Sequence, residues 1–176
     1  MDKKSGRRRH LANYSLDASG AYVYTGKYYA FTAPADAVRR AKRWTLALSL
    51  LSAAALLVTG IANFEGSRVF YVIIPYVFMF LPAYLSVSAS VKLQAVSDNM
   101  TENQADSTVI RLKHATLFLV ILGVVSLVGD LCFILWGGCA NPAGECGFLA
   151  ACFIVVLLNS VLFYILSRNF CIIMRD

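Results

Sequence analysis

The sequence predicts an all-α integral membrane protein, built as a four-transmembrane-helix bundle of two helical hairpins. Three observations predict this fold: an excess of apolar residues, their concentration in four long runs, and the one-sided placement of Lys and Arg between the runs. Hydrophobic residues make up 59% of the 176 residues and charged residues 15%, whereas a soluble domain averages about 45–50% and about 25%. Apolar residues gathered into long runs are typical of membrane spans.

The four expected spans are residues 44–63, 69–91, 115–136 and 148–167. At about 1.5 Å of rise per residue, each helix would be roughly 30–35 Å long, which matches a hydrocarbon core of about 30 Å. Every backbone amide must be satisfied inside such a core, and the runs do not alternate as barrel strands do. We therefore expect helices.

The distribution of cations predicts the orientation of the spans. Of the 16 Lys and Arg, ten precede the first span, three lie in residues 92–114, two follow the fourth span, and only Arg68 falls on the other side. Because positively charged loops stay in the cytoplasm, we expect a multi-pass protein of the cell membrane with both termini cytoplasmic.

The chain divides into a basic cytoplasmic region, residues 1–43, and a transmembrane domain, residues 44–176. Within the first region, residues 22–31 are rich in strand formers around Thr25 and Gly26, which predicts a small hairpin. The alternative is that the aromatic side chains of this segment lie in the lipid headgroup layer, where Tyr and Trp are favoured.

Two helix starts can be recognised ahead of the spans. Thr32 is a candidate cap for a helix with Pro34 and Asp36 in its first turn, and we expect this helix to continue into the first span. Thr101 and Gln104 match a capping box, so the third helix should begin near Glu102, well before its apolar part.

Asp130 is the most informative residue of the predicted spans. It lies six residues before Trp136, so roughly 9 Å from the end of its helix. Intramembrane acidic groups are energetically costly and often mark an ion or proton path. One interpretation is such a path, shared with Asn159 near the middle of the fourth span; the other is structural pairing of Asp130 with Arg68, and hydrogen bonding of Asn159 across helices.

The second span contains Pro75 and Pro82, seven residues apart and therefore on one face of the helix. Each proline removes a backbone donor and tends to kink a helix. We expect a kink here; the alternative is a broken helix at a transport site.

Small residues form a face on each of the first two spans, and they permit close helix contact within one subunit or between subunits. These residues are Ser49, Ala53 and Gly60 on the first span and Ser86 and Ser90 on the second.

Two cysteines, Cys139 and Cys146, flank the predicted external loop. An oxidising exterior would allow them to form a disulfide bond, which the sequence predicts. A metal site at this loop is not expected, because neither histidine lies on that side of the membrane.

The basic cluster before the first span, Arg39, Arg40, Lys42 and Arg43, is a candidate for contact with lipid headgroups. Its alternative role is to set the topology. The net charge of +6 is explained by such flanking cations, and because no nucleic-acid-binding motif accompanies it, nucleic acid is not an expected partner.

No catalytic, cofactor or phosphate-binding motif can be recognised in the sequence, so we expect neither an enzyme nor a bound cofactor. The leading hypothesis is a non-enzymatic accessory or interaction subunit of a membrane complex, with a homo-oligomer or another membrane protein as its partner in the bilayer. The alternative is a small oligomeric transporter or channel that uses Asp130 and Asn159.

Overall fold

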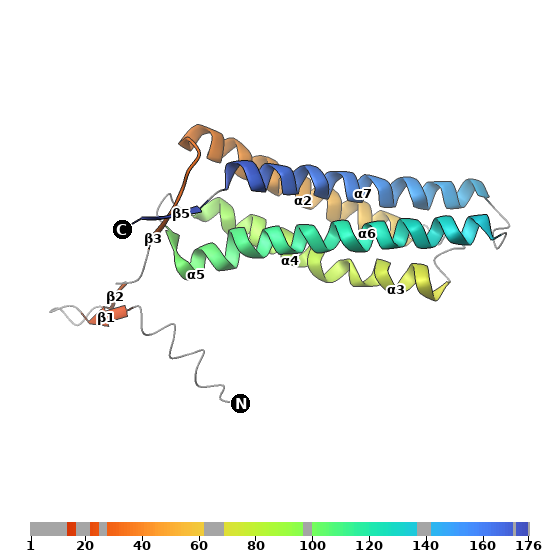
Figure 1. Ribbon diagram of the computed structural model, residues 1–176, viewed down its shortest axis with the longest axis horizontal. Helices are drawn as coiled ribbons and strands as arrows, with labels where there is room; N and C mark the ends of the chain where they lie inside the picture. Colours follow the sequence, from red (N-terminus) through yellow and green to blue (C-terminus); the bar gives the residue numbers. More distant parts are fainter. Residues whose placement is uncertain are drawn as a thin grey trace, which may run out of the picture.

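Four long helical segments lie side by side along the long axis of the computed structural model (Figure 1). The structure describes residues 14–16, 22–24, 28–61, 69–96, 100–136, 142–170 and 172–175. The first segment is α2 (Ala35–Ile61), and the second consists of α3 (Phe70–Phe78) and α4 (Phe80–Ala95). The third runs from α5 (Glu102–Ala105) through η2 (Asp106–Ile110) into α6 (Arg111–Leu135), and the fourth is α7 (Pro142–Asn169).

Each of the four helical segments is long and apolar enough to cross a membrane. Every segment contains its predicted span nearly completely and extends beyond it at the end that carries the strands. Helix α2 packs against α4 and α7, and α6 packs against the same two helices. The described chain thus forms a four-helix bundle in which consecutive segments are antiparallel neighbours, a common arrangement for short connections.

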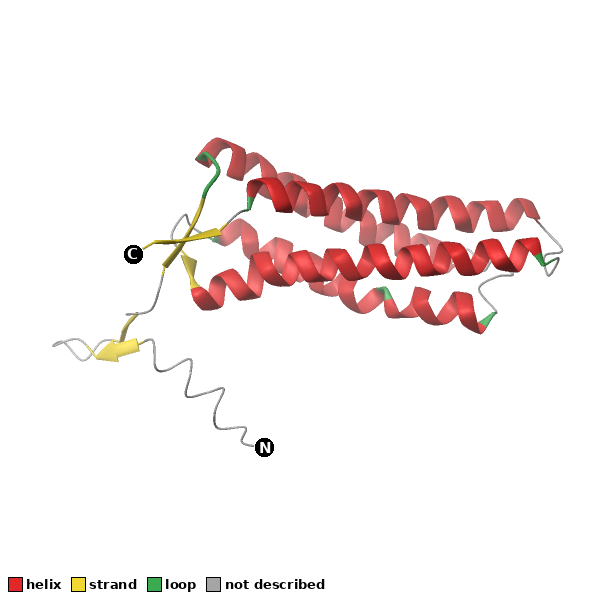
Figure 2. Cartoon of the chain, in the orientation of Figure 1, coloured by secondary structure: helices red, strands yellow, loops and turns green. Residues whose placement is uncertain are grey.

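The second segment is broken between its two prolines. α3 ends at Phe78 and α4 begins at Phe80, with Met79 as a turn between them (Figure 2). Pro82 has no N–H to donate to the carbonyl of Phe78, four residues earlier, which accounts for the break. Both prolines are buried, as the prediction of a shared face requires, and the helix is interrupted in the region where the kink was predicted.

Of the two predicted helix starts, the capping box at Thr101 is confirmed, whereas the predicted cap at Thr32 is not shown, and Pro34 precedes the helix instead of lying in its first turn. Helix α2 begins at Ala35, carries Asp36 in its first turn and continues without interruption to Ile61. At the start of α5, the Thr101 hydroxyl accepts a hydrogen bond from the Gln104 N–H at 3.4 Å, and the Gln104 side chain accepts one from the Thr101 N–H at 3.1 Å. This reciprocal pair is a capping box.

Five short strands lie at the end of the bundle where the termini are (Figure 1). β1 (Tyr14–Leu16) pairs with β2 (Tyr22–Tyr24), and β3 (Tyr28–Phe31) pairs antiparallel with both β4 (Met100–Thr101) and β5 (Ile172–Arg175). The predicted strand formers around Thr25 are strands, but they pair with other segments instead of with each other. We call this end of the bundle the terminal end, and the opposite end, where α6 ends and α7 begins, the loop end.

The bundle has two apolar cores. The first lies towards the terminal end, where the Phe31 and Phe170 rings also meet edge to face at 5.3 Å. Its buried residues are Val38, Ala41, Ala89, Leu93, Val109, Leu112, Leu162, Leu166 and Phe170. The second lies towards the loop end and consists of Leu56, Val72, Tyr76, Met79, Ala83, Leu119, Phe148, Cys152 and Val155. Most other large hydrophobic side chains of the helices face outward, as in a bundle surrounded by lipid.

Candidate functional site

Two acidic side chains are buried together at the loop end of the bundle. Asp130 lies in the last two turns of α6 and is 0% exposed, and Glu145 lies in the first turn of α7 and is 1% exposed. The short connection between α6 and α7 brings these two turns side by side, and the two carboxyl groups are within hydrogen-bonding reach of each other. We call Asp130 and Glu145 the acid pair.

The acid pair brings two hydrogen-bond acceptors together when both groups are ionised. An ionised carboxylate only accepts hydrogen bonds, and a protonated one can also donate. Neither oxygen of Asp130 receives a hydrogen bond from an N–H or O–H group of the described residues. Two ionised carboxylates at this place would therefore leave Asp130 without a donor and would repel each other.

The neighbours of the acid pair are mostly apolar. Cys152, two turns after Glu145 on α7, is buried and close enough to Asp130 for an electrostatic interaction. Tyr76 of α3 donates a hydrogen bond to the Leu56 carbonyl of α2 and packs its ring 5.8 Å from that of Phe148. These contacts surround the carboxyl groups with low-dielectric material.

The backbone of α3 fits closely against α6 beside Asp130. Pro75 cannot donate to the carbonyl of Tyr71, four residues earlier, so this oxygen lacks its usual helical partner. A Cβ atom placed on Gly129 would lie 3.1 Å from the Tyr71 oxygen. The combination of a proline on α3 and a glycine on α6 therefore allows the two helices to approach closely next to the acid pair.

A second buried polar group lies near the middle of the bundle. The Ser49 hydroxyl of α2 contacts the Ser90 and Ser86 hydroxyls of α4 at 2.8 Å and 3.3 Å. Three residues further along α2, the Ser52 hydroxyl accepts a hydrogen bond from the Asn159 amide of α7 at 2.7 Å. We call these five residues, Ser49, Ser52, Ser86, Ser90 and Asn159, the middle polar layer. The serine faces predicted on the first two spans therefore meet each other within one chain.

The structure does not bring Asp130 and Asn159 together. Asn159 follows Glu145 by 14 residues on α7, which corresponds to roughly 21 Å along the helix. Phe148, Cys152 and Val155 are buried on the intervening turns of α7. The two predicted site residues thus belong to separate polar groups with an apolar core between them.

Arg68, the predicted partner of Asp130, lies outside the described residues, so that pairing stays a prediction. The partner that the structure does assign to Asp130 is Glu145, which sequence reasoning placed in an external loop. A signal for it was present: Pro142 is favoured in the first turn of a helix, and a helix that starts there carries Glu145 inward on its first turn.

The predicted disulfide between Cys139 and Cys146 is not formed in the structure. Cys146 is a free and exposed thiol, and Cys139 lies outside the described residues. The prediction took Cys146 as a loop residue. Because α7 already begins at Pro142, its position is instead set by the helix.

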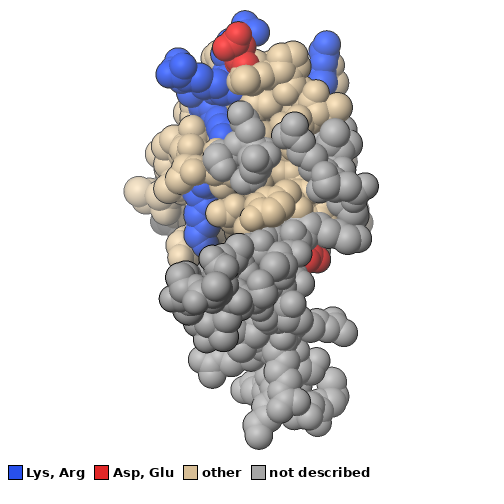
Figure 3. All heavy atoms as spheres, turned by 90° about the vertical axis from the view of Figure 1, so that its left-hand side faces the viewer, with Lys and Arg blue, Asp and Glu red and all other residues tan. Residues whose placement is uncertain are grey.

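The predicted headgroup cluster is exposed at the terminal end, with one exception. Figure 3 looks onto this end and shows Lys and Arg side chains on its surface. Arg39, Arg40 and Arg43 are exposed, but Lys42 donates a hydrogen bond to the Val96 carbonyl at 2.6 Å and lies 5.6 Å from the centre of the Phe31 ring. Lys42 therefore ties α2 to the end of α4, which leaves the three arginines for contact with other molecules.

No group of three or more His, Cys, Asp or Glu side chains suited to a metal ion occurs in the described part of the chain. No protein-family model, no curated protein and no solved structure matches this chain.

Proposed function

We propose that this chain is a multi-pass membrane protein that serves as a non-enzymatic accessory or interaction subunit of a membrane complex. In this proposal the four helical segments cross the bilayer and both termini are cytoplasmic. The support for the orientation is the cation count: 15 of the 16 Lys and Arg belong to the side of the termini, as expected for cytoplasmic segments.

The observation that carries the proposed interaction role is the position of Tyr84. Its side chain is 70% exposed on the outer face of α4. It follows Phe70, the start of α3, by 14 residues and precedes Ala95, the end of α4, by 11, so it lies roughly 21 Å and 16 Å from the two ends. In a bilayer this position is deep among the acyl chains.

The Tyr84 hydroxyl makes no hydrogen bond with the described residues. Tyrosine is favoured at the membrane–water interface, where its hydroxyl stays wet, but acyl chains offer it no hydrogen-bond partner. A partner protein with an acceptor at this depth would satisfy it. Phe80, one turn before Tyr84, is also exposed, and aromatic residues are enriched at protein interfaces.

Tyr164 provides a matched comparison within the same chain. It is 61% exposed on α7, but its hydroxyl accepts a hydrogen bond from Arg168 at 3.2 Å. Tyr164 therefore needs no partner, and the surface around Tyr84 is the better candidate for an interface.

The test is site-specific photo-crosslinking in native membranes, with a photoreactive phenylalanine derivative placed at position 80 beside Tyr84. We expect a discrete protein product, whose mass distinguishes a second copy of this chain from another membrane protein. Adding Tyr84→Phe should lower its yield several-fold, whereas Tyr164→Phe should not. Lipid adducts alone, or equal yields in the two variants, would contradict the proposal.

The acid pair favours a second candidate function, proton-linked transport. Asp130 and Glu145 are two carboxyl groups buried side by side, and intramembrane acidic groups often lie on proton paths. A path along the whole bundle would also have to pass the apolar core between Asp130 and Asn159.

This candidate is tested by proton flux into liposomes that contain the protein and a trapped pH dye. Transport predicts that the parent chain speeds acidification after an acid pulse and that Asp130→Asn abolishes the effect. Asp106→Asn, at an exposed carboxylate, is the control. No flux in the parent, or equal flux in Asp130→Asn, would remove this candidate.

A further inference from the structure

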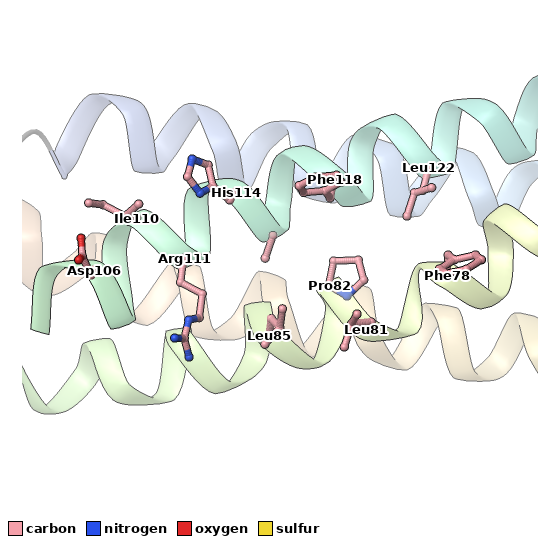
Figure 4. Close-up of a pocket in the computed structure, with 11 residues that line it drawn as sticks. Phe78, Leu81, Pro82, Leu85, Asp106, Ile110, Arg111, His114, Phe118 and Leu122 are labelled. Carbon is pink, nitrogen blue, oxygen red and sulfur yellow. The ribbon is translucent and has the colours of Figure 1, made fainter. Parts of the chain in front are cut away.

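An apolar groove runs along the outside of the bundle between the second and third helical segments (Figure 4). Its volume is about 580 Å³, within the range of small-molecule sites. Phe78, Leu81 and Leu85 form one wall, and Phe118 and Leu122 form the other. Pro82, which breaks the second segment, also lines the groove.

The groove changes character at the terminal end, where Asp106, Arg111 and His114 line it. All three side chains are exposed, and Figure 4 shows that Arg111 extends from α6 towards α4. The groove therefore combines a long apolar part with a short part that carries both signs of charge.

A π-helical turn brings the two opposite charges to the same groove. The backbone N–H of Arg111 bonds to the carbonyl of Asp106, five residues earlier. In a regular α-helix, residues five apart point in clearly different directions, because 3.6 residues make a turn. The i→i+5 bond of a π turn reduces this difference in direction, and such turns occur frequently at functional sites.

We propose that this groove binds a phospholipid with a primary ammonium headgroup, such as phosphatidylethanolamine. The Arg111 guanidinium, with His114 beside it, would hold the phosphate. The Asp106 carboxylate would accept hydrogen bonds from the ammonium group. One acyl chain would lie along Phe118 and Leu122 towards Phe78.

The dimensions of the groove agree with this occupant. Arg111 and Leu122 are 11 residues apart on α6, which corresponds to roughly 16 Å. Half of a hydrocarbon core of about 30 Å is about 15 Å, so the apolar part spans one leaflet when the charged part is at its surface.

The charges also discriminate among headgroups. A lipid with a net negative charge would bind Arg111 but be repelled by Asp106, and a trimethylated ammonium has no N–H to donate to a carboxylate. A primary ammonium headgroup satisfies both charged side chains. This inference does not depend on Tyr84 or on a protein partner, because Tyr84 is not a lining residue.

The test is native mass spectrometry of the full chain in mild detergent with added phosphatidylethanolamine, phosphatidylcholine or phosphatidylglycerol. We expect bound phosphatidylethanolamine to be retained best. Arg111→Gln should lower retention of all three lipids on the order of tenfold, as expected for the loss of a charge-assisted contact. Asp106→Asn should remove only the preference for phosphatidylethanolamine, and Leu122→Trp, which fills the apolar part, should lower retention of all three.

Arg168→Gln is the matched control, because Arg168 is an exposed cation on α7 that does not line the groove. It should leave retention unchanged. Equal retention of the three lipids by the parent chain would overturn the proposal. So would an unchanged lipid preference in Asp106→Asn, or equal losses in Arg111→Gln and Arg168→Gln.

Discussion

The middle polar layer and the acid pair are both buried in this bundle, but they differ in charge and in the hydrogen bonds that they make. In the middle layer, neutral hydroxyl and amide groups bond to each other and to the backbone of their own helices, as Ser49 does with the Thr45 carbonyl at 2.7 Å. In the acid pair, two acceptors face each other, and Asp130 receives no other donor from the described residues. Both groups contain buried oxygens without a donor among the described residues, namely Oδ1 of Asn159 in the middle polar layer and both carboxyl oxygens of Asp130 in the acid pair. The difference teaches that burial alone does not identify a functional group: the middle polar layer is neutral and holds four serine hydroxyls and an amide donor, whereas the acid pair brings two carboxyl groups together.

The largest expected effect tests the helix contact that separates the two groups. A Cβ atom on Gly123 of α6 would lie 2.6 Å from Cγ2 of Val156 on α7, a clash that forces the helices apart. We expect Gly123→Ala to lower the free energy of unfolding in mixed micelles by about 1–3 kcal/mol. Ala54→Val, at an exposed position on α2, is the control. Equal effects of the two substitutions would show that the close contact of α6 and α7 is not needed.

Removing an acidic group from the acid pair should raise the free energy of unfolding instead of lowering it. An amide at position 130 can donate two N–H groups to Glu145, where the carboxylate could only accept. We expect Asp130→Asn to raise the free energy of unfolding by about 1–2 kcal/mol, as found when buried charges are replaced by neutral groups. Asp106→Asn, at an exposed carboxylate, should change it little. A lower free energy of unfolding for Asp130→Asn than for the parent chain would contradict this prediction, and the two polar groups would then respond alike to substitution.

The corresponding change in the middle polar layer should lower stability. Asn159→Leu keeps the size of the side chain but removes the donor to the Ser52 hydroxyl. We expect it to lower the free energy of unfolding by about 0.6–1.7 kcal/mol, the range for hydrogen bonds between membrane helices. Ser160→Ala, one residue later and exposed, removes only a bond to the Val156 carbonyl of its own helix and should have less effect. A gain in stability in Asn159→Leu would place this layer in the same category as the acid pair.

The fold could be predicted largely from local sequence, because span length, capping and proline effects act over a few residues. The capping box at Thr101 and the break before Pro82 are examples. The partners of β3 could not be predicted in this way, since β5 lies at the opposite end of the chain. Strand pairing across such a separation depends on how the helices bring the segments together.

The candidate site was predicted only in part for a related reason. Asp130 is conspicuous as a lone acid in an apolar run, but its partner was sought by charge complementarity, which indicates Arg68. Glu145 is an acid like Asp130, so a search for an oppositely charged partner does not lead to it. The loop end of the structure was needed to place Glu145 on α7, facing α6.

The smallest expected effect compares two buried serines, one in the middle polar layer and one a single turn before the acid pair. The Ser49 hydroxyl contacts Thr45, Ser86 and Ser90, whereas the Ser126 hydroxyl, one turn before Asp130, makes no hydrogen bond with the described residues. Ser49→Ala should therefore lower the free energy of unfolding by about 0.5–1 kcal/mol. Ser126→Ala should leave it unchanged or raise it slightly, because it removes a buried polar atom that has no partner. If Ser126→Ala proved the more destabilising of the two, the Ser126 hydroxyl would have to form a hydrogen bond with the acid pair. Ser126 would then be a third member of that group.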